Sequence, residues 1–139
     1  MNLVRRCALL ALSLFLLTQL PGCASAKKED GLNAVLREYA SLIRWGRFDL
    51  AWEQLEPKLR EKEPFTTEIR AAYDAIQVAR YDDDIATVNA DGTVTQLVRI
   101  EYILRDSQRL GATVDRQIWR YDETAQRWWL TTGLPKLNH

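Results

Sequence analysis

The chain has 139 residues, with 19 basic and 19 acidic side chains. This balance excludes the basic excess that is typical of nucleic-acid binding or of polybasic contacts with lipid headgroups. No apolar stretch reaches the length of a membrane span. No residue pattern matches a zinc site, a phosphate-binding loop or a pair of nucleophile and base.

The first 22 residues have the features of a secretory signal peptide. Arg5 and Arg6 form a positive start, and an apolar run of about ten residues follows from Ala8 to Leu17. As a helix, this run would be roughly 15 Å long, which is half of a bilayer core and too short to span a membrane. Removal of residues 1–22 would leave 117 residues with a net charge of −2.

The signal peptide ends in Leu20, Pro21, Gly22 and Cys23. This stretch resembles the lipobox of bacterial lipoproteins, in which an apolar residue and two small ones precede the cysteine; Pro21 departs from the usual small residue. The resemblance implies a diacylglyceryl thioether on Cys23, cleavage before it and acylation of the new N-terminus, and two or more acyl chains anchor a protein stably. The alternative is a secreted protein with an unmodified thiol. Because Cys7 would be removed, no disulfide within the chain is expected.

Residue 24 is alanine. In well-studied Gram-negative bacteria an aspartate at this place retains a lipoprotein at the inner membrane, so the resemblance implies the outer membrane, on its periplasmic face, with a Gram-negative source assumed. Residues 24–31 are small or charged and contain no large apolar side chain. We therefore expect residues 23–31 to form the lipidated cysteine and a flexible tether, followed by a single domain over residues 32–139.

Helical patterns come first in this domain. Apolar residues recur at helical spacing from residue 32 to residue 43, and Gly46 is expected to end this helix. Asp49 is expected to cap a second helix. Pro57 either kinks that helix or begins a new one. A third short helix is expected to begin at residue 66 or 67.

The apolar period then changes from 3.6 to 2, which indicates strands. We expect a first strand interrupted at residues 82–84, a long strand over residues 94–104, a strand over residues 112–121 that contains a β-bulge, and a last strand over residues 127–132. Helices followed by an antiparallel meander predict an α+β fold, with N-terminal helices packed on one face of a curved four-stranded antiparallel sheet.

Two segments resemble the nuclear transport factor 2-like superfamily, with its cystatin-like α+β domain. YASLIRWGRFDLAWEQLEP, residues 39–57, is similar to its helical hairpin, and IWRYDETAQRWWLTTG is similar to its last strand hairpin. The similarity covers about residues 32–134. In the first segment the matching residues are Gly46, Phe48, Asp49, Ala51, Trp52, Leu55 and Pro57.

The resemblance implies a cone-shaped domain with a strongly bent sheet around the helices, often with a pocket at the open end. Some members are dehydratases or isomerases that use Asp/His pairs, and others are binding or assembly domains. Relatives often form homodimers through the outer sheet face. The only histidine of this chain is the terminal His139, so we predict no catalytic residue and no cofactor.

Asp115, Arg99 and Arg116 are the candidate ligand-binding residues. The arginines belong to a charged set on two neighbouring strands, which forms either a cross-strand ladder or a site for an anion. No metal site is expected, because the acidic run at residues 82–84 lacks a calcium-loop pattern and successive side chains alternate between faces. The charged set comprises Arg99, Glu101, Arg105, Arg116 and Arg120.

Five tryptophans are many for a domain of this size, and aromatic residues in small domains are usually core. Trp128 and Trp129 are adjacent on a strand, so one is expected in the core and the other at the rim or surface. The sequence favours a lipid-anchored periplasmic binding or assembly module without catalysis, with the membrane and an envelope protein as partners. The alternative is a small-molecule binder or weak acid–base enzyme, for which polar groups must converge inside the cone rather than Trp and Leu fill it.

Overall fold

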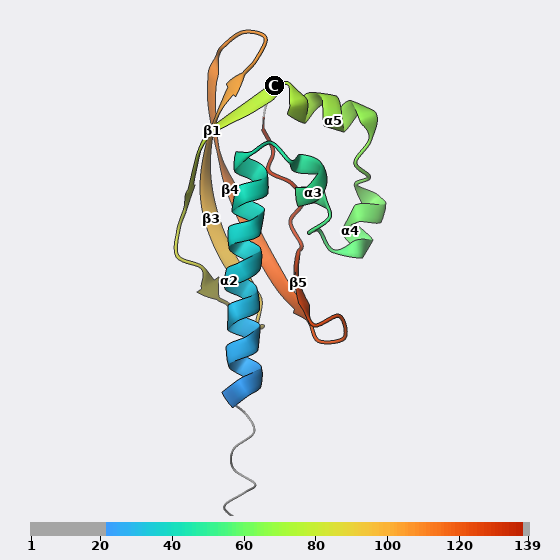
Figure 1. Ribbon diagram of the computed structural model, residues 1–139, viewed down its shortest axis with the longest axis vertical. Helices are drawn as coiled ribbons and strands as arrows, with labels where there is room; N and C mark the ends of the chain where they lie inside the picture. Colours follow the sequence, from blue (N-terminus) through green and yellow to red (C-terminus); the bar gives the residue numbers. More distant parts are fainter. Residues whose placement is uncertain (1–21, 138–139) are drawn as a thin grey trace, which may run out of the picture. The chain divides into compact units, whose positions relative to one another are not determined.

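The computed structural model describes the backbone of residues 22–137 and the side chains of residues 24–137 (Figure 1). Residues 1–21 of the predicted signal peptide, the side chain of Cys23 and His139 lie outside these described residues. The chain divides into two compact units, residues 1–33 and residues 34–139. No helix among the described residues is long and apolar enough to cross a membrane.

In the first unit, the described residues form the beginning of helix α2 (Gly22–Arg44). This helix includes the segment whose composition predicts a flexible tether. Alanine, lysine and glutamate dominate that segment and are strong helix formers, so the lack of large apolar residues has not prevented helical backbone. The domain boundaries predicted at residues 23 and 32 stay predictions.

The second unit is α+β, which confirms the predicted fold class (Figure 1). Helices come before a curved antiparallel sheet with the order β1-β3-β4-β5, and a short β2 pairs with β3. After the end of α2, the elements are α3 (Phe48–Trp52), α4 (Pro57–Lys62), α5 (Thr67–Asp74), β1 (Ile76–Asp83), β2 (Thr87–Val88), β3 (Val94–Leu104), β4 (Leu110–Asp122) and β5 (Arg127–Leu130).

Local sequence signals explain where α2 ends and where α3 begins. Gly46 has φ +70°, and the N–H groups of Gly46 and Arg47 donate to the carbonyls of Ile43 and Leu42 at 3.1 and 2.8 Å. This is a Schellman motif, which satisfies the last carbonyls of the helix. The predicted cap at Asp49 is wrong, because α3 begins at Phe48 and Asp49 lies in its first turn, 3.6 Å from an arginine on either side.

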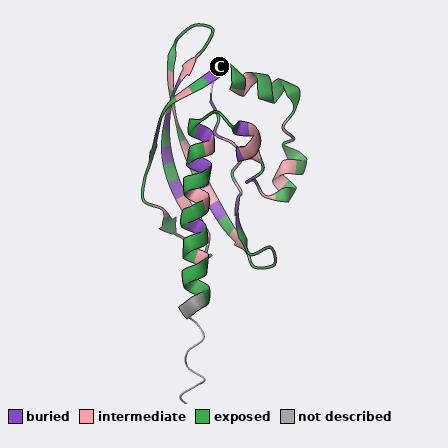
Figure 2. Cartoon of the chain, viewed as in Figure 1, coloured by how far each residue is buried: buried purple, intermediate pink, exposed green. Residues whose placement is uncertain are grey.

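The structure decides between the alternatives predicted for the two following helices. Pro57 is the first residue of α4, where its missing N–H leaves no helical bond unmade. The Thr66 hydroxyl accepts from the Ile69 N–H at 3.3 Å and caps α5. Neither helix contains a buried residue (Figure 2). Side-chain contacts hold them instead: Tyr73 stacks on Phe48 with the ring centroids 4.3 Å apart.

The register of the sheet corrects the predicted bulge. β3 and β4 pair without a shift from Val94↔Trp119 to Ile103↔Leu110, so β4 has no bulge along this pairing. Successive side chains of a strand point to opposite faces. The even-numbered apolar residues of β4 therefore lie on one face of the sheet, and the odd-numbered ones lie on the other. The irregularity lies in β1, between Val78 and Arg80. Residues 82–84 are exposed, but Asp82 and Asp83 pair with Arg99 and Val98 of β3. The predicted interruption of the strand at residue 82 is therefore wrong, and β1 ends at Asp83.

The last strand is paired along both edges. One edge pairs with β4, and on the other edge the Leu130 N–H donates to the Gln54 carbonyl while the Leu130 carbonyl accepts from Glu56, both at 2.9 Å. Trp128 and Trp129 are both buried, so the prediction that one of them lies at the rim or surface is wrong.

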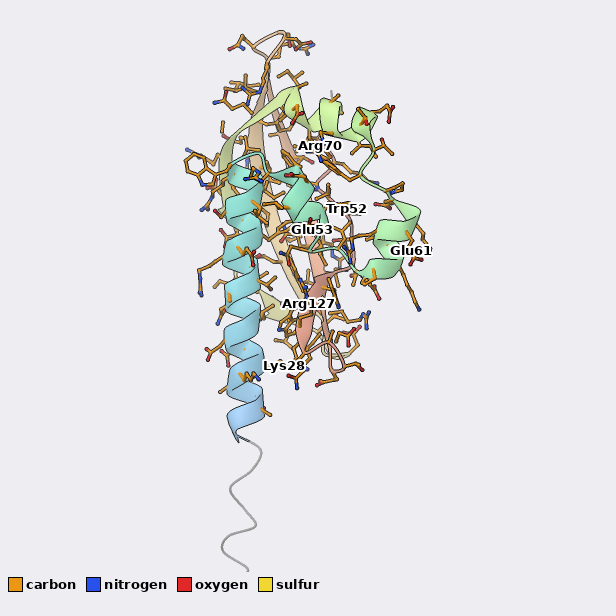
Figure 3. All side chains as sticks on the ribbon, turned by 45° about the vertical axis from the view of Figure 1, so that its right-hand side comes forward. Lys28, Trp52, Glu53, Glu61, Arg70 and Arg127 are labelled. Carbon is orange, nitrogen blue, oxygen red and sulfur yellow. The ribbon has the colours of Figure 1, made fainter. Side chains whose placement is uncertain are left out.

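An alternating stack covers Trp129. The Arg127 guanidinium lies 3.9 Å from the centre of the Trp129 ring, and Arg60 lies 5.8 Å from Trp129 and 5.5 Å from Trp52. Figure 3 labels Arg127 on β5 and Trp52 on α3, the two ends of this stack. Such cation–π contacts contribute about 0.5–2 kcal/mol each, and they attach α4 to the sheet.

Candidate functional site

The inner face of β4 changes from apolar to polar along its length. Trp119 and Gln117 are completely buried, and Asp115 and Thr113 are half-buried. These side chains point to the same face because they are two residues apart on a regular strand. The interior is therefore filled at the Trp119 end and more open at the Asp115 end.

Gln117 connects the polar groups of this face. Its Nε2 donates to Asp115 Oδ2 and to Tyr81 Oη, each at 3.0 Å. Its Oε1 accepts a long hydrogen bond of 3.4 Å from Trp119 Nε1. The orientation of the amide follows from its partners, since an indole N–H only donates and an ionised carboxylate only accepts.

Three tyrosines from different elements lie close enough to this carboxyl for its charge to affect their pKa values. Tyr39 comes from α2, Tyr73 from α5 and Tyr81 from β1. The Tyr73 hydroxyl donates to the Pro135 carbonyl at 3.1 Å. The Tyr39 hydroxyl is buried and has no hydrogen-bond partner, although its ring packs edge-on against Trp119 at 5.3 Å. We call Asp115, Gln117, Tyr39, Tyr73 and Tyr81 the Asp115 cluster.

The electrostatics of the cluster are set by burial and by one negative charge. Burial raises the pKa of Asp115, and the hydrogen bond from Gln117 offsets part of this effect. Burial, with the charge of Asp115 as a further cause, raises the pKa of Tyr73 to about 12. The same two causes raise the pKa values of Tyr39 and Tyr81, again with burial as the larger one.

No lysine or arginine among the described residues lies within ion-pair distance of Asp115. The guanidinium of Arg44 is instead placed over the Tyr81 ring, 5.3 Å from its centre, and donates to the Tyr81 carbonyl at 3.1 Å. Asp115 is thus a half-buried carboxyl with a single neutral donor. It can accept further hydrogen bonds when ionised, or donate one when protonated.

The structure does not bring the three predicted site residues together. Arg99 and Arg116 lie on the outer face of the sheet, whereas Asp115 pairs with Val98 and faces inward. Arg99 Nε lies 3.3 Å from Glu101 Oε1, and Glu101 also pairs with Arg80 of β1 at 3.9 Å. The outer charges therefore include a cross-strand ion pair between β1 and β3, and we call Arg80, Arg99 and Glu101 the outer charge ladder. Among the described residues no ion pair joins β3 to Arg116 or Arg120 of β4, so the predicted ladder between these two strands does not form.

Sequence reasoning missed most of the Asp115 cluster. Gln117 could have been found, because period 2 places it between Asp115 and Trp119 on one face. Tyr39 belongs to an apolar helical stripe, and nothing in its local sequence separates it from a core residue. Tyr73 and Tyr81 approach the cluster only through the packing of α5 and β1.

The sequence left two alternatives for the interior: filling by Trp and Leu side chains, or convergence of polar groups. The structure has features of both. Trp119, Leu55 and Leu130 fill the space between helices and sheet at one end. At the other end an aspartate and several hydroxyls converge, but the only arginine contact in the cluster is that of Arg44 with Tyr81. The structure therefore offers a polar inner site without the predicted pairing of inward Arg and Asp.

The outer face of β3 and β4 carries exposed apolar side chains among its charges. Leu110 is 80% exposed, Val114 62% and Leu97 42%. A hollow of about 320 Å³ on this side is lined by Glu101, Leu110, Gly111 and Ala112. This surface is therefore a second candidate site.

The described residues contain no group of three metal-ligating side chains. No protein-family model, curated protein or solved structure matches the chain. The residues themselves are therefore the basis for a functional proposal.

Proposed function

We propose that this protein is a lipid-anchored binding module of the bacterial cell envelope. The segment Leu20-Pro21-Gly22-Cys23 and Ala24 support an acylated Cys23 at the periplasmic face of the outer membrane. In this proposal the domain binds a small polar molecule at the Asp115 cluster and carries out no catalysis.

Mass spectrometry of the mature N-terminus from a membrane fraction tests the anchor. We expect a chain that begins at Cys23 and carries a diacylglyceryl group, with Cys23→Ser blocking both processing and membrane retention. A free thiol on Cys23, or a chain that still begins at Met1, would refute the anchor and the proposed location together.

The half-buried Asp115 carboxyl is the single observation that carries the binding proposal. Gln117 is its one neutral donor, and it forms no ion pair among the described residues. A charged group that is partly removed from water requires a partner of opposite charge or several donors. The Tyr39 hydroxyl has no partner and does not supply one, so a polar ligand at the accessible side of Asp115 would provide the donors that the protein lacks.

Two matched substitutions test whether the cluster serves binding or the fold. Tyr39→Phe removes a hydroxyl without a partner, so we expect the free energy of unfolding to stay the same or rise. Tyr73→Phe removes a hydroxyl that donates to Pro135, so we expect a loss of about 0.5–1.5 kcal/mol. Urea unfolding measures both. If Tyr39→Phe is the more destabilising of the two, the hydroxyl has a structural partner and the binding proposal loses its support.

The exposed apolar residues of the outer sheet face favour a second candidate function, assembly with an envelope protein. Leu97, Leu110 and Val114 are exposed on this face, with Arg116 directly opposite Leu97 and Arg99 directly opposite Val114. Arginine is enriched at protein–protein interfaces, where exposed apolar side chains become buried.

Pull-down from detergent-solubilised envelope tests the second candidate. We expect Val114→Asp to abolish capture of a defined protein, while Trp45→Ser retains it, since Trp45 is also exposed but lies at the end of α2. Light scattering on the purified chain identifies the case in which the partner is a second copy. Equal capture by Val114→Asp and wild type would exclude this face.

A further inference from the structure

The segment from the start of α4 to the end of α5, residues 57–74, is the least buried part of the second unit, and we call it the strap. None of its residues, all of which the structure describes, is buried (Figure 2). We infer that the strap opens as one unit while the sheet stays folded, and that its opening uncovers the aromatic rings of Phe48 and Trp129.

The two ends of the strap are held by the sheet. Before the strap, the Leu130 N–H donates to the Gln54 carbonyl and the Glu56 N–H donates to the Leu130 carbonyl, both at 2.9 Å. After it, the Ala75 carbonyl accepts from the Arg105 N–H at 2.9 Å, and β1 begins at the next residue. Both ends therefore keep their places when the residues between them separate from the domain.

The helices of the strap are too short to be stable alone. α4 has six residues and α5 has eight, whereas isolated helices shorter than about 12 residues are marginal in water. Their backbone hydrogen bonds therefore depend on the contacts between the strap and the rest of the domain. When these contacts break, both helices melt and their amide hydrogens exchange with solvent.

A stack of side chains closes the α4 end of the strap. The Arg60 guanidinium lies 5.5 Å from the centre of the Trp52 ring and 5.8 Å from that of Trp129. The Trp52 indole N–H also donates to the Glu63 carbonyl at 2.7 Å. Arg60 Nε is buried and has no hydrogen-bond partner among the described residues. Opening lets water bond to this group, which offsets part of the cost of breaking the stack.

One tyrosine and one ion pair close the α5 end. Tyr73 stacks on Phe48 with the ring centroids 4.3 Å apart, and its hydroxyl donates to the Pro135 carbonyl at 3.1 Å. Arg70, which Figure 3 labels on α5, lies 3.6 Å from Asp49. Phe48 is only 2% exposed, so the loss of the tyrosine ring exposes an aromatic surface that is otherwise hidden.

Phe65 connects the contacts at the two ends. It lies between α4 and α5, and its ring centroid is 6.3 Å from that of Trp52 and 6.2 Å from that of Tyr73. The Arg70 guanidinium lies 4.9 Å from the centre of the same ring. A ring that takes part in the contacts of both ends couples them, so α4 and α5 open together.

Hydrogen exchange of the folded protein in increasing urea tests the inference. After correction for intrinsic rates, we expect the amides of α4 and α5 to exchange about 100-fold faster than those of β3 and β4, or more. Their rates should depend only weakly on urea, because local opening exposes little surface. If both sets of amides share one rate and one urea dependence, the domain unfolds as a whole and the inference is wrong.

Two matched variants distinguish opening as one unit from fraying of separate helices. Arg60→Met breaks the stack with Trp52 and Trp129, so exchange should rise several-fold in α5 as well as in α4. Lys58→Met is the control, because Lys58 is exposed on the same helix and makes no ion pair or ring contact among the described residues. It should leave exchange unchanged. A rise confined to α4 would show that each helix frays by itself.

Hydroxyl-radical footprinting tests which rings are uncovered. Tyr73→Leu removes the stack on Phe48 and the bond to Pro135, both at the α5 end. Below the urea concentration at which β3 and β4 unfold, we expect this variant to raise the oxidation of Trp129, which contacts the strap only at the α4 end. The completely buried Trp119 should stay protected. If Trp129 stays as protected as Trp119, the strap does not open as one unit and the inference is overturned.

Discussion

The inner and outer faces of β3 and β4 use the same two backbones for different purposes. The strands pair in continuous register, so the faces differ only in their side chains. Inside, Trp119 and Gln117 are completely buried and Asp115 is half-buried. Outside, exposed Leu97 and Val114 alternate with charges. The inner face therefore determines stability, and the outer face can change with little effect on the fold.

The largest expected effect is the difference in free energy of unfolding between a substitution on the inner face and one on the outer face. Trp119→Ala removes a completely buried indole that packs against Tyr39, and we expect a loss of about 3–5 kcal/mol in the free energy of unfolding. Val114→Ala on the outer face should change it by about 0.5 kcal/mol or less. Chemical denaturation measures both. Losses of similar size would show that the outer face is covered in the folded protein.

The second prediction concerns the close approach of Gly111 to Tyr102 across the strand pair. A Cβ at Gly111 would lie 2.5 Å from a carbon of the Tyr102 ring. Tyr102 is only 3% exposed. We expect Gly111→Ala to destabilise the protein by about 1–3 kcal/mol, because the ring must move within a packed interior.

A double-mutant cycle checks the cause of this effect. In the background of Tyr102→Leu, which removes the ring, Gly111→Ala should cost less than about 0.5 kcal/mol. If the cost is the same in both backgrounds, the requirement for glycine comes from the backbone rather than from the aromatic contact.

The third prediction uses the titration of Asp115. Burial raises the pKa of this carboxyl in the folded state, so the folded state holds the proton more tightly than the unfolded chain. Stability contributed by this group is present at acid pH and falls as the pH rises from the unfolded pKa through the folded one. Gln117 donates a hydrogen bond to it, and its charge raises the pKa values of Tyr39, Tyr73 and Tyr81.

Asp115→Asn removes this titration. We expect the variant to gain stability over wild type with rising pH, by on the order of 1 kcal/mol at neutral pH. Unfolding by urea across the acid and neutral range measures the difference between the two proteins. A constant difference at all pH values would mean that the carboxyl has the same pKa in both states.

Much of the fold was predictable because its signals are local. The change of period from 3.6 to 2 located the strands, and Pro57 and Thr66 marked helix starts by their own chemistry. The burial of Trp129 was not predictable, because Arg60 of α4 and Arg127 cover its ring and only tertiary packing brings Arg60 there.

The candidate site was predictable only in part. Asp115 is its central residue, as a sequence hypothesis suggested, but Arg99 and Arg116 could not join it. Residues 115 and 116 are neighbours on a strand and must face opposite ways. The tyrosines of the cluster come from α2, α5 and β1, and only tertiary packing brings them to one carboxyl.

The smallest expected effect concerns the outer charge ladder. Glu101 lies 3.3 Å from Arg99 and 3.9 Å from Arg80, and all three side chains are at least one-third exposed. Exposed ion pairs contribute about 0.2–1 kcal/mol. Glu101→Gln should therefore cost about 0.5 kcal/mol at low salt, and the cost should disappear at high salt because the Debye length shortens. A loss above 2 kcal/mol that persists in high salt would show that these charges are shielded from solvent, and the outer face would then be an occupied interface rather than a free one.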